Sequence, residues 1–373
     1  MLEQTVKKLA EGLNNLINEE DGLGDPFLSS HNYRVQPFSA DNFEPIKPVE
    51  SSRKIAFVDG GNLPLIEAPN FTVQLNRVYY GIFAGRKRVP PVSLPQRVEF
   101  FSITVAKFRK GQIFYDTTVF PVSEEFEELI PRSSDLSFSS ADRRLTVGGG
   151  RADIGRVATV ARRFAEWEFA KHVIMKELGR GDVLVMDGTL RTAFPNESKY
   201  ARAAYTEAYA KGIIYTGLSK TSQMFTTTGL SLLGALRKMA IDNKIGPVWY
   251  YYPIAESISP EHEAAIFVVK LNDQSPRIFR YEIQGGQAKA LTATEINEIF
   301  SQLSANSSSL EFPGYPYGLV DADDNARVRR EEVDSYQVML LSEISKLGVS
   351  SKFMRHMQSI DAHDVLEAMR GVS

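Results

Sequence analysis

The chain has 373 residues with a formal net charge of −3, 43% hydrophobic and 24% charged residues, and no cysteine. This length and balance suit one large soluble domain with appendages, or two domains, and the lack of cysteine excludes disulfides and thiolate chemistry. The slight negative charge argues against a surface that coats nucleic acid indiscriminately, but it allows a basic groove beside an acidic site.

The N-terminal residues predict a helix and no targeting signal. Val6, Leu9, Leu13, Leu16 and Ile17 recur at helical spacing, which indicates an amphipathic helix over residues 3–19 that needs a partner. No signal-peptide core is present, and no stretch reaches the roughly 18 apolar residues of a membrane span. We therefore expect a cytoplasmic protein without membrane contact. Residues 20–52 are rich in Pro, Ser, Asn and Asp and are typical of a long connector.

A series of strands follows the connector without helices between them. Strands are predicted at residues 53–59, 73–86, 98–107 and 112–120, and residues 121–150 have the composition of loops. The rest of the chain is mainly alternating: a helix over 151–178, a strand at 182–187, a helix at about 197–211, a strand at 212–220, a helix at 226–243, strands near 247–252, 263–270 and 277–283, and helices near 293–304 and 321–345.

This order of elements predicts an α/β protein with a ribonuclease H-like mixed sheet. Such a fold joins an antiparallel meander to a strand–helix–strand unit and covers the sheet with helices. A doubly wound Rossmann sheet needs helices between its early strands, and residues 73–120 offer none. The N-terminal helix and the later strands and helices are expected as additions to this core.

Two of the predicted strands end in the same dipeptide, Asp-Gly. Asp59 in "IAFVDGG" ends the first strand, and Asp187 in "VLVMDGT" ends the strand after the long helix. The carboxyl ends of strands in an open sheet face one crevice, so we expect these acids to meet although they lie 128 residues apart (187 − 59). Gly60 and Gly188 are expected to let the backbone turn and to leave room for a ligand.

The long helix carries a third candidate acid in "RRFAEWEFAKHV". Glu166 lies next to the apolar side of this helix, whereas Glu168 lies roughly 200° further round, so the two cannot face the same site. We therefore prefer Glu166. Arg162 and Arg163 are interpreted as solvated residues on the exposed side.

A fourth acid and a lysine complete the candidate site. Asp321, Asp323 and Asp324 are expected in the first turn of a helix after "GYPYG", where at least two of them would only complement the helix dipole. Lys220, at the end of "YTGLSK", is positioned to meet a phosphate as a point charge. Aromatic residues in the strands are interpreted as core.

Carboxylates without cysteine or paired histidines favour magnesium or manganese over zinc. Two such ions about 4 Å apart activate a water and stabilise the leaving oxygen of a phosphodiester. The residues alone thus indicate metal-assisted chemistry on a phosphate.

Five segments, "IAFVDGG", "ARRFAEWEFA", "VLVMDGTL", "GLSKTS" and "GYPYGLVDAD", in this order and spacing, resemble the NurA nuclease family over about residues 50–345. The resemblance implies a metal-dependent nuclease that processes single- or double-stranded DNA ends in DNA repair, as a homodimer, with a HerA-type hexameric DNA-translocating ATPase. The N-terminal helix would then serve the dimer interface or the contact with the ATPase. The implied domains are a helix and connector (1–50), a NurA-like nuclease domain (51–345) and a helical tail (346–373).

The resemblance also assigns roles to the candidate residues. It implies that Asp59, Glu166 and Asp187 bind one or two divalent ions, typically Mn²⁺ with Mg²⁺ as the alternative. Asp323 stands where the family has His or Asp, so it remains a metal ligand but not a general base near neutral pH. Gly318 replaces a proline that is usual in the family. The expected catalytic residues are Asp59, Glu166, Asp187 and Lys220.

Two other functions remain open at this point. Actin-like and sugar-kinase-like ATPases also begin a phosphate loop with strand-Asp-Gly, but the residues after Asp59, "GGNLPLIEAP", lack the hydroxyl and basic groups expected there. An adaptor of the ATPase with an idle site is the third hypothesis, which the presence of all three core acids disfavours.

Overall fold

The computed structural model describes residues 2–16, 22–28, 32–146, 148, 150–257, 259–310, 312–349 and 353. The helical tail expected at 346–373 therefore falls largely outside the described residues. Among the described helices, none combines the length and the apolar character needed to cross a membrane.

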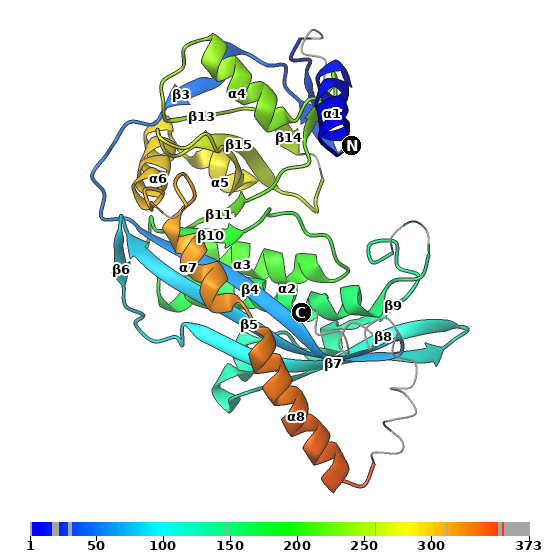
Figure 1. The fold of residues 1–373 in the computed structure, drawn as a ribbon. Helices are drawn as coiled ribbons and strands as arrows, with labels where there is room; N and C mark the ends of the chain where they lie inside the picture. The colour runs from blue at the N-terminus through cyan, green and yellow to red at the C-terminus, as the bar shows by residue number, and fades with distance from the viewer. Residues whose placement is uncertain are drawn as a thin grey trace.

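A 14-stranded mixed sheet runs through the molecule (Figure 1). Neighbouring strands in its central part are antiparallel on the meander side, whereas β4, β10 and β11 are parallel to one another. An antiparallel meander is thus joined to a strand–helix–strand unit, which confirms the predicted mixed sheet flanked by helices. In spatial order the six central strands are β8 (Gln112–Pro121), β7 (Arg97–Arg109), β5 (Phe71–Ala84), β4 (Lys54–Ala68), β10 (Val183–Asp187) and β11 (Ile214–Ser219).

Further strands extend this sheet on both sides. The stretch predicted as a connector supplies two of them, β2 and β3. In β3, Phe43 packs edge-on against Trp249 and Tyr251 and is buried, which the composition of residues 20–52 does not indicate. The added strands are β9 (Ser137–Ser139) beside β8, β6 (Lys87–Val89) beside β5, and β16 (Phe279–Gln284), β15 (Ala264–Lys270), β14 (Ala255–Ser257), β13 (Trp249–Tyr251), β3 (Phe43–Pro45) and β2 (Tyr33–Val35) beyond β11; β1 (Pro26–Phe27) and β12 (Phe225–Thr226) form a separate pair.

Helices cover both faces of the central strands because β4 is apolar on both sides. Ala56 and Val58 pack beneath α2 and α3, whereas Ile55 and Phe57 pack beneath α6 and α7. The outer strands are covered by α4. Helix α8 packs on the C-terminal part of β4 and the N-terminal part of β5. The helices are α2 (Ile154–Lys176), α3 (Glu197–Lys211), α4 (Leu232–Asp242), α5 (Gly285–Ala290), α6 (Ala293–Asn306), α7 (Tyr317–Ala326) and α8 (Arg330–Lys346), with short 3₁₀ turns at Ala40–Asn42, Glu124–Leu129 and Ser133–Asp135.

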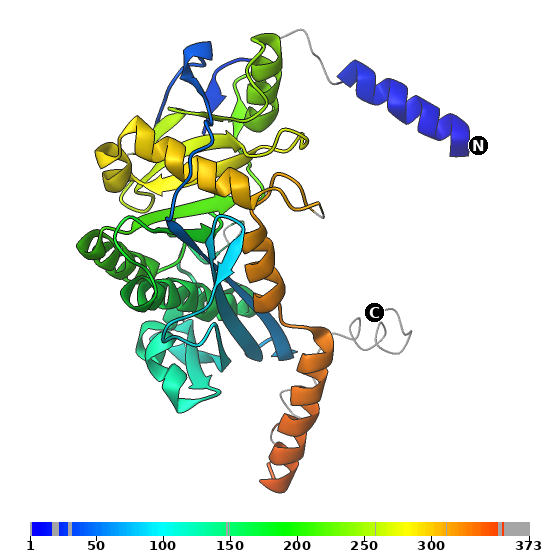
Figure 2. The same ribbon diagram turned by 90° about the vertical axis from the view of Figure 1, so that its left-hand side faces the viewer.

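The N-terminal helix α1 (Leu2–Leu16) stands away from the rest of the molecule (Figure 2). The predicted helix is thus confirmed over the described residues, while Ile17 lies outside them. Leu2, Val6, Leu9 and Leu13 on one side of α1 are exposed. The described residues therefore leave the apolar stripe of α1 uncovered.

Several predicted boundaries differ from the structure, and two of them bear on the site. The first strand does not end at Asp59, because β5 pairs with β4 all the way to Ala68 opposite Phe71. The helix predicted over 321–345 is two helices, α7 and α8. Arg77 fixes the corner between them, since its guanidinium donates to the carbonyl of Arg327 (2.5 Å) and pairs with Glu332 (2.6 Å).

Candidate metal centre

Three carboxylates from three elements meet near the point where β10 and β4 part. Asp59 lies in β4, Asp187 ends β10, and Asp323 lies on α7. One carboxylate oxygen from each lies within 4.8 Å of the other two, and all three side chains are partly buried. The backbones of β4 and β10 pair only as far as Val58 opposite Met186, so the two strand acids stand side by side directly beyond that pair.

The pleat of the sheet explains why the acids share one face. Side chains two residues apart along a strand point to the same side. Phe57 and Val185 pack beneath α7, so Asp59 and Asp187, two residues further on, also face α7. Asp323 completes the group from α7, the helix that packs on this face. The predicted convergence of Asp59 and Asp187 therefore follows from register, although only Asp187 ends its strand.

The two glycines after Asp59 serve close approach and not a turn. A Cβ on Gly60 would lie 2.7 Å from Oε1 of Glu166, and a Cβ on Gly61 would collide with the carbonyl of Ala326 at the end of α7. The strand passes straight through both residues. Gly188 does make the predicted turn, because its φ of 109° is in the region that favours glycine.

A third close approach explains the glycine in "GYPYG". A Cβ on Gly318, in the first turn of α7, would overlap the ring of Phe57. The proline that the resemblance leads us to expect at this position would carry such a Cβ. Phe57 and Gly318 are thus complementary, and together they set how closely α7 lies on β4.

The acids create a local excess of negative charge around Asp59. Burial first, and then the charges of Asp187 and Glu166, raise the pKa of Asp59 from 3.8 to about 8. The hydrogen bond donated by the Gly60 N–H (2.7 Å) and the charge of Lys220 offset this only in part. A divalent cation would relieve the same excess.

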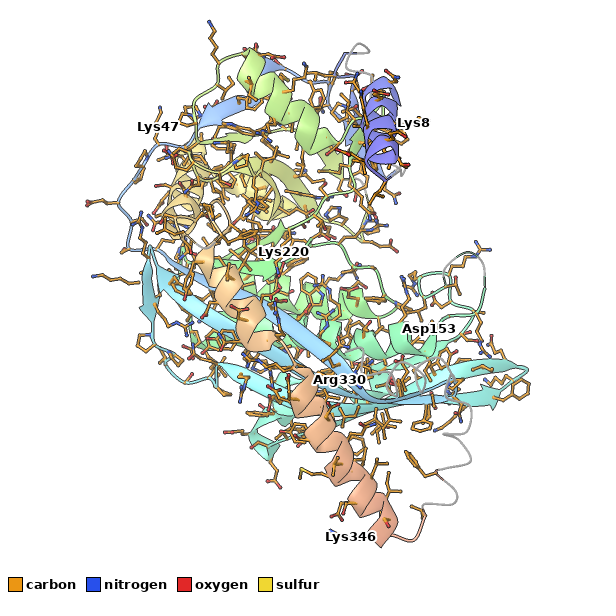
Figure 3. The ribbon with its side chains drawn as sticks, viewed as in Figure 1. Lys8, Lys47, Asp153, Lys220, Arg330 and Lys346 are labelled. Carbon is orange, nitrogen blue, oxygen red and sulfur yellow. The ribbon has the colours of Figure 1, made fainter. Side chains whose placement is uncertain are left out.

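Lys220 lies beside α7 in direct contact with two of the acids (Figure 3). Its Nζ is 2.7 Å from Oδ2 of Asp187 and 2.6 Å from Oδ1 of Asp323. Burial alone would raise the pKa of Asp323, but the hydrogen bonds from Lys220 and Arg327 outweigh it and lower this pKa. Asp323 thus stays ionised at neutral pH.

The acids of α7 are not in its first turn, so their predicted dipole role is wrong. The helix begins at Tyr317, which places Asp321, Asp323 and Asp324 beyond the first turn. Asp321 pairs with Arg88 and accepts a hydrogen bond from Tyr79 (3.4 Å). Side-chain cations, and not the helix N-terminus, therefore stabilise these acids.

Sequence reasoning missed Tyr315. This side chain is buried, its hydroxyl donates to Oδ1 of Asp187 (3.5 Å), and its ring centroid lies 5.7 Å from Nζ of Lys220. Burial, followed by the charge of Asp187, raises the pKa of Tyr315 well above its ordinary value, so the hydroxyl remains protonated. Its place in "GYPYG", shortly before the acids of α7, was the available signal.

Glu166 lies next to the three acids but on the α2 side of β4. Its carboxylate, only 3% exposed, is paired with Arg162 and with Arg163 (2.9 Å). Arg163 also pairs with Glu197 (2.8 Å) and donates to the carbonyl of Thr189 (3.2 Å) in the loop after Asp187. The two arginines are thus not the solvated residues that the sequence predicts. The structure brings three of the four expected ligands together and places Glu166 behind Gly60, held by two cations.

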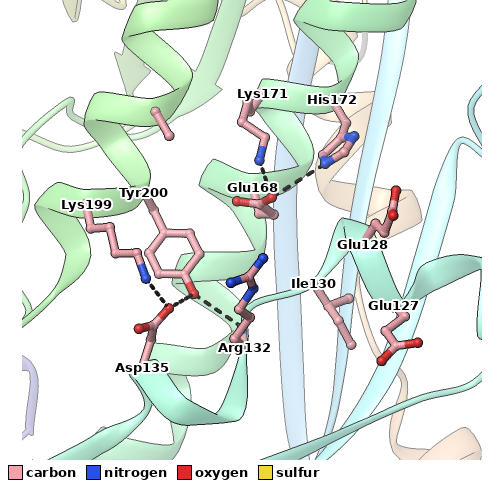
Figure 4. Close-up of a pocket in the computed structure, with 11 residues that line it drawn as sticks. Glu127, Glu128, Ile130, Arg132, Asp135, Glu168, Lys171, His172, Lys199 and Tyr200 are labelled. Atoms are coloured by element: carbon pink, nitrogen blue, oxygen red, sulfur yellow. Dashed lines mark hydrogen bonds and ion pairs between the residues drawn. The ribbon is translucent and has the colours of Figure 1, made fainter.

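Glu168 belongs to a different site (Figure 4). It pairs with Lys171 and lies 3.5 Å from Nε2 of His172, on the outer side of α2. These residues line a cavity of about 770 Å³, and none of the clustered acids is among its lining residues. Glu166 and not Glu168 therefore lies near the cluster, in agreement with the direction expected from helical spacing.

The donors at this centre fit a hard divalent cation. All are carboxylate oxygens and they are partly buried. After burial, the charges of Asp187 and Glu166 raise the pKa of Asp59, as expected where negative charges gather. Magnesium and manganese prefer such oxygen ligands. The cluster of Asp59, Asp187 and Asp323 is thus a candidate metal centre.

One family model matches this chain. The family model of the NurA domain matches residues 53–328. Among solved structures, the NurA nuclease of Sulfolobus solfataricus is similar at 13% identity and a TM-score of 0.48, covering 92% of this chain and 95% of that one. Endonuclease V of Ciona intestinalis, in complex with inosine-containing DNA, is similar at 9% identity and a TM-score of 0.35, covering 78% and 88%. No curated protein matches the sequence.

Proposed function

Since this chain belongs to the NurA family of nucleases, we propose that it is a divalent-metal-dependent deoxyribonuclease that hydrolyses phosphodiester bonds at DNA ends. The observation that carries the proposal is the meeting of Asp59, Asp187 and Asp323 within 4.8 Å of one another inside the matched region. Manganese or magnesium, as one or two ions, is the proposed cofactor.

The side chains divide the work of such a reaction. The bound ion supplies an activated water and stabilises charge on the leaving oxygen. Asp59, Asp187 and Asp323 hold it through their oxygens, and Glu166 is proposed to support this set from behind Gly60. Lys220 binds a non-bridging oxygen of the phosphate and stabilises the negative charge that develops there. Asp323, with its lowered pKa, acts as a ligand and not as a proton acceptor.

The family resemblance supplies the proposed partners. We propose DNA as substrate, single- or double-stranded, a homodimer as the working form, and a HerA-type hexameric ATPase as the partner in DNA repair in the cytoplasm. The exposed stripe of α1, formed by Leu2, Val6, Leu9 and Leu13, supports a role of this helix in one of these contacts.

The direct test is degradation of labelled single- and double-stranded DNA with manganese, magnesium or EDTA. We expect ion-dependent degradation by the wild type, a loss of at least about a hundredfold in Asp187→Ala, and near wild-type rates in Asp324→Ala. Asp324 is a matched control because it lies on α7 but is 67% exposed and outside the cluster. Equal rates in Asp187→Ala and wild type would refute the proposed centre.

A further inference from the structure

Lys220 occupies the position of a cation within the acid cluster. It follows directly after β11, the strand beside β10, so its side chain reaches the two acids from a neighbouring strand. Its Nζ contacts one oxygen of Asp187 and one of Asp323, at 2.7 and 2.6 Å. Both carboxylates also belong to the group with metal-ligand spacing.

Contact with Lys220 and coordination of a divalent ion involve the same two carboxylates, Asp187 and Asp323. An ammonium and a dication a few ångströms apart repel each other strongly at a partly buried site. Lys220 is on the accessible side of the cluster, since 41% of its side chain is exposed, whereas Asp187 is 13% exposed. Its flexible chain can therefore move outward without repacking the core.

We propose that Lys220 is an internal counter-ion, which must leave Asp187 and Asp323 before these carboxylates can bind a divalent ion, and which is thereby released to bind a phosphate. The inference rests on the proposed function. It makes the order of binding part of the site: the metal-free protein keeps Lys220 on its own acids, and phosphate contact at Lys220 follows ion binding.

Arg327 offers a matched comparison on the same carboxylate. It pairs with Asp323 through Oδ2 (2.9 Å), the oxygen that Lys220 does not contact, and its side chain is 63% exposed. Arg327 can keep this contact while Oδ1 of Asp323 binds an ion. Removing either cation takes one positive charge from Asp323, but only the removal of Lys220 also frees Asp187.

The first experiment measures Mn²⁺ affinity without DNA, by calorimetry. We expect Lys220→Met to bind Mn²⁺ roughly tenfold more tightly than wild type, because a competing charge is removed. Arg327→Met should stay within about twofold, and Lys220→Arg, which keeps the charge, should bind no more tightly than wild type. Unchanged or weaker Mn²⁺ binding by Lys220→Met would overturn the inference. Lys220→Gln is a second variant without the charge, and circular dichroism spectra check that the fold is intact.

The second experiment measures binding of a short single-stranded oligonucleotide by fluorescence anisotropy, in EDTA and in Ca²⁺. We expect equal affinities of wild type and Lys220→Met in EDTA, and severalfold tighter binding by wild type in Ca²⁺. An equal loss in both conditions would show that Lys220 is available to phosphate all along, which contradicts the inference.

These outcomes separate the inference from the proposed function. A wild type that binds Mn²⁺, with tighter binding in Lys220→Met, but cleaves no DNA refutes the proposed nuclease and leaves the counter-ion intact. Mn²⁺ binding by neither protein overturns both.

Discussion

Asp59→Asn should stabilise the metal-free protein at neutral pH. The folded protein holds the pKa of Asp59 at about 8, against an ordinary value of 3.8. Because the folded state binds this proton more tightly than the unfolded state, the favourable contribution is complete below about pH 4 and is lost as the pH rises towards 8. Asparagine has nearly the same shape, can still accept the hydrogen bond from Gly60, and carries no charge.

The size of the effect follows from the two pKa values. Relative to the unfolded chain, a pKa near 8 in place of 3.8 lowers the stability of the folded protein at pH 7 by at most about 4 kcal/mol. The carboxylate is only partly buried, and Lys220 can adjust its position. We therefore expect Asp59→Asn to raise the free energy of unfolding by about 1–3 kcal/mol at pH 7.

The assay is urea unfolding in EDTA at pH 5, 7 and 8.5. The stability of Asp59→Asn relative to wild type should grow between pH 5 and 8 and then level off, and Asp324→Asn should show no such growth. Manganese should reverse the order by stabilising only the wild type. A constant difference across pH, or a wild type more stable than Asp59→Asn at pH 8.5 in EDTA, would refute the electrostatic reasoning.

Three further predictions concern the same centre. Mn²⁺ affinity should rise with pH between 6 and 8, by up to about tenfold per pH unit, because Asp59 must lose its proton; calorimetry in two buffers of different ionisation enthalpy detects the released proton. Gly318→Ala should lower stability by about 2 kcal/mol or more, and Phe57→Leu should recover part of this loss by removing the ring that a Cβ would strike; thermal unfolding of both single variants and the double variant measures it. Glu166→Gln should lower the free energy of unfolding by about 2–4 kcal/mol, because the part-buried Arg162 and Arg163 lose their shared partner. Glu168→Gln, whose partners lie outside this cluster, is the control. Equal losses of stability in the two variants would contradict the role of Glu166 as the shared partner of the two arginines.

The sequence predicted the acids better than it predicted what surrounds them. Asp59 and Asp187 follow apolar runs, and that pattern reflects a local register that a single sequence can show. The continuation of β4 beyond Asp59 depends on pairing with β5, which is a long-range property. Asp323 was identified only through the family resemblance, because α7 approaches the other two acids through tertiary packing.

The arginines and Tyr315 show a second limit. Arg162 and Arg163 on an otherwise mixed helix look like exposed residues until the positions of Glu166 and Glu197 are known. Tyr315 precedes α7 in a loop, and no spacing rule predicts its hydroxyl next to Asp187. Predicting such contacts requires the distances between elements, which glycines such as Gly60 and Gly318 set.

The adjacent glycines of β4 divide the centre into two independently adjustable halves. At these two residues only the backbone of β4 separates its two faces. Glu166 lies close to Gly60 on one face, and the end of α7 lies close to Gly61 on the other. Adding one methyl group at Gly60 pushes on the α2 side, while the same addition at Gly61 lifts α7 and the Asp323 that it carries. Alanine at Gly60 and alanine at Gly61 can therefore test separately how the α2 side and how α7 position the acids.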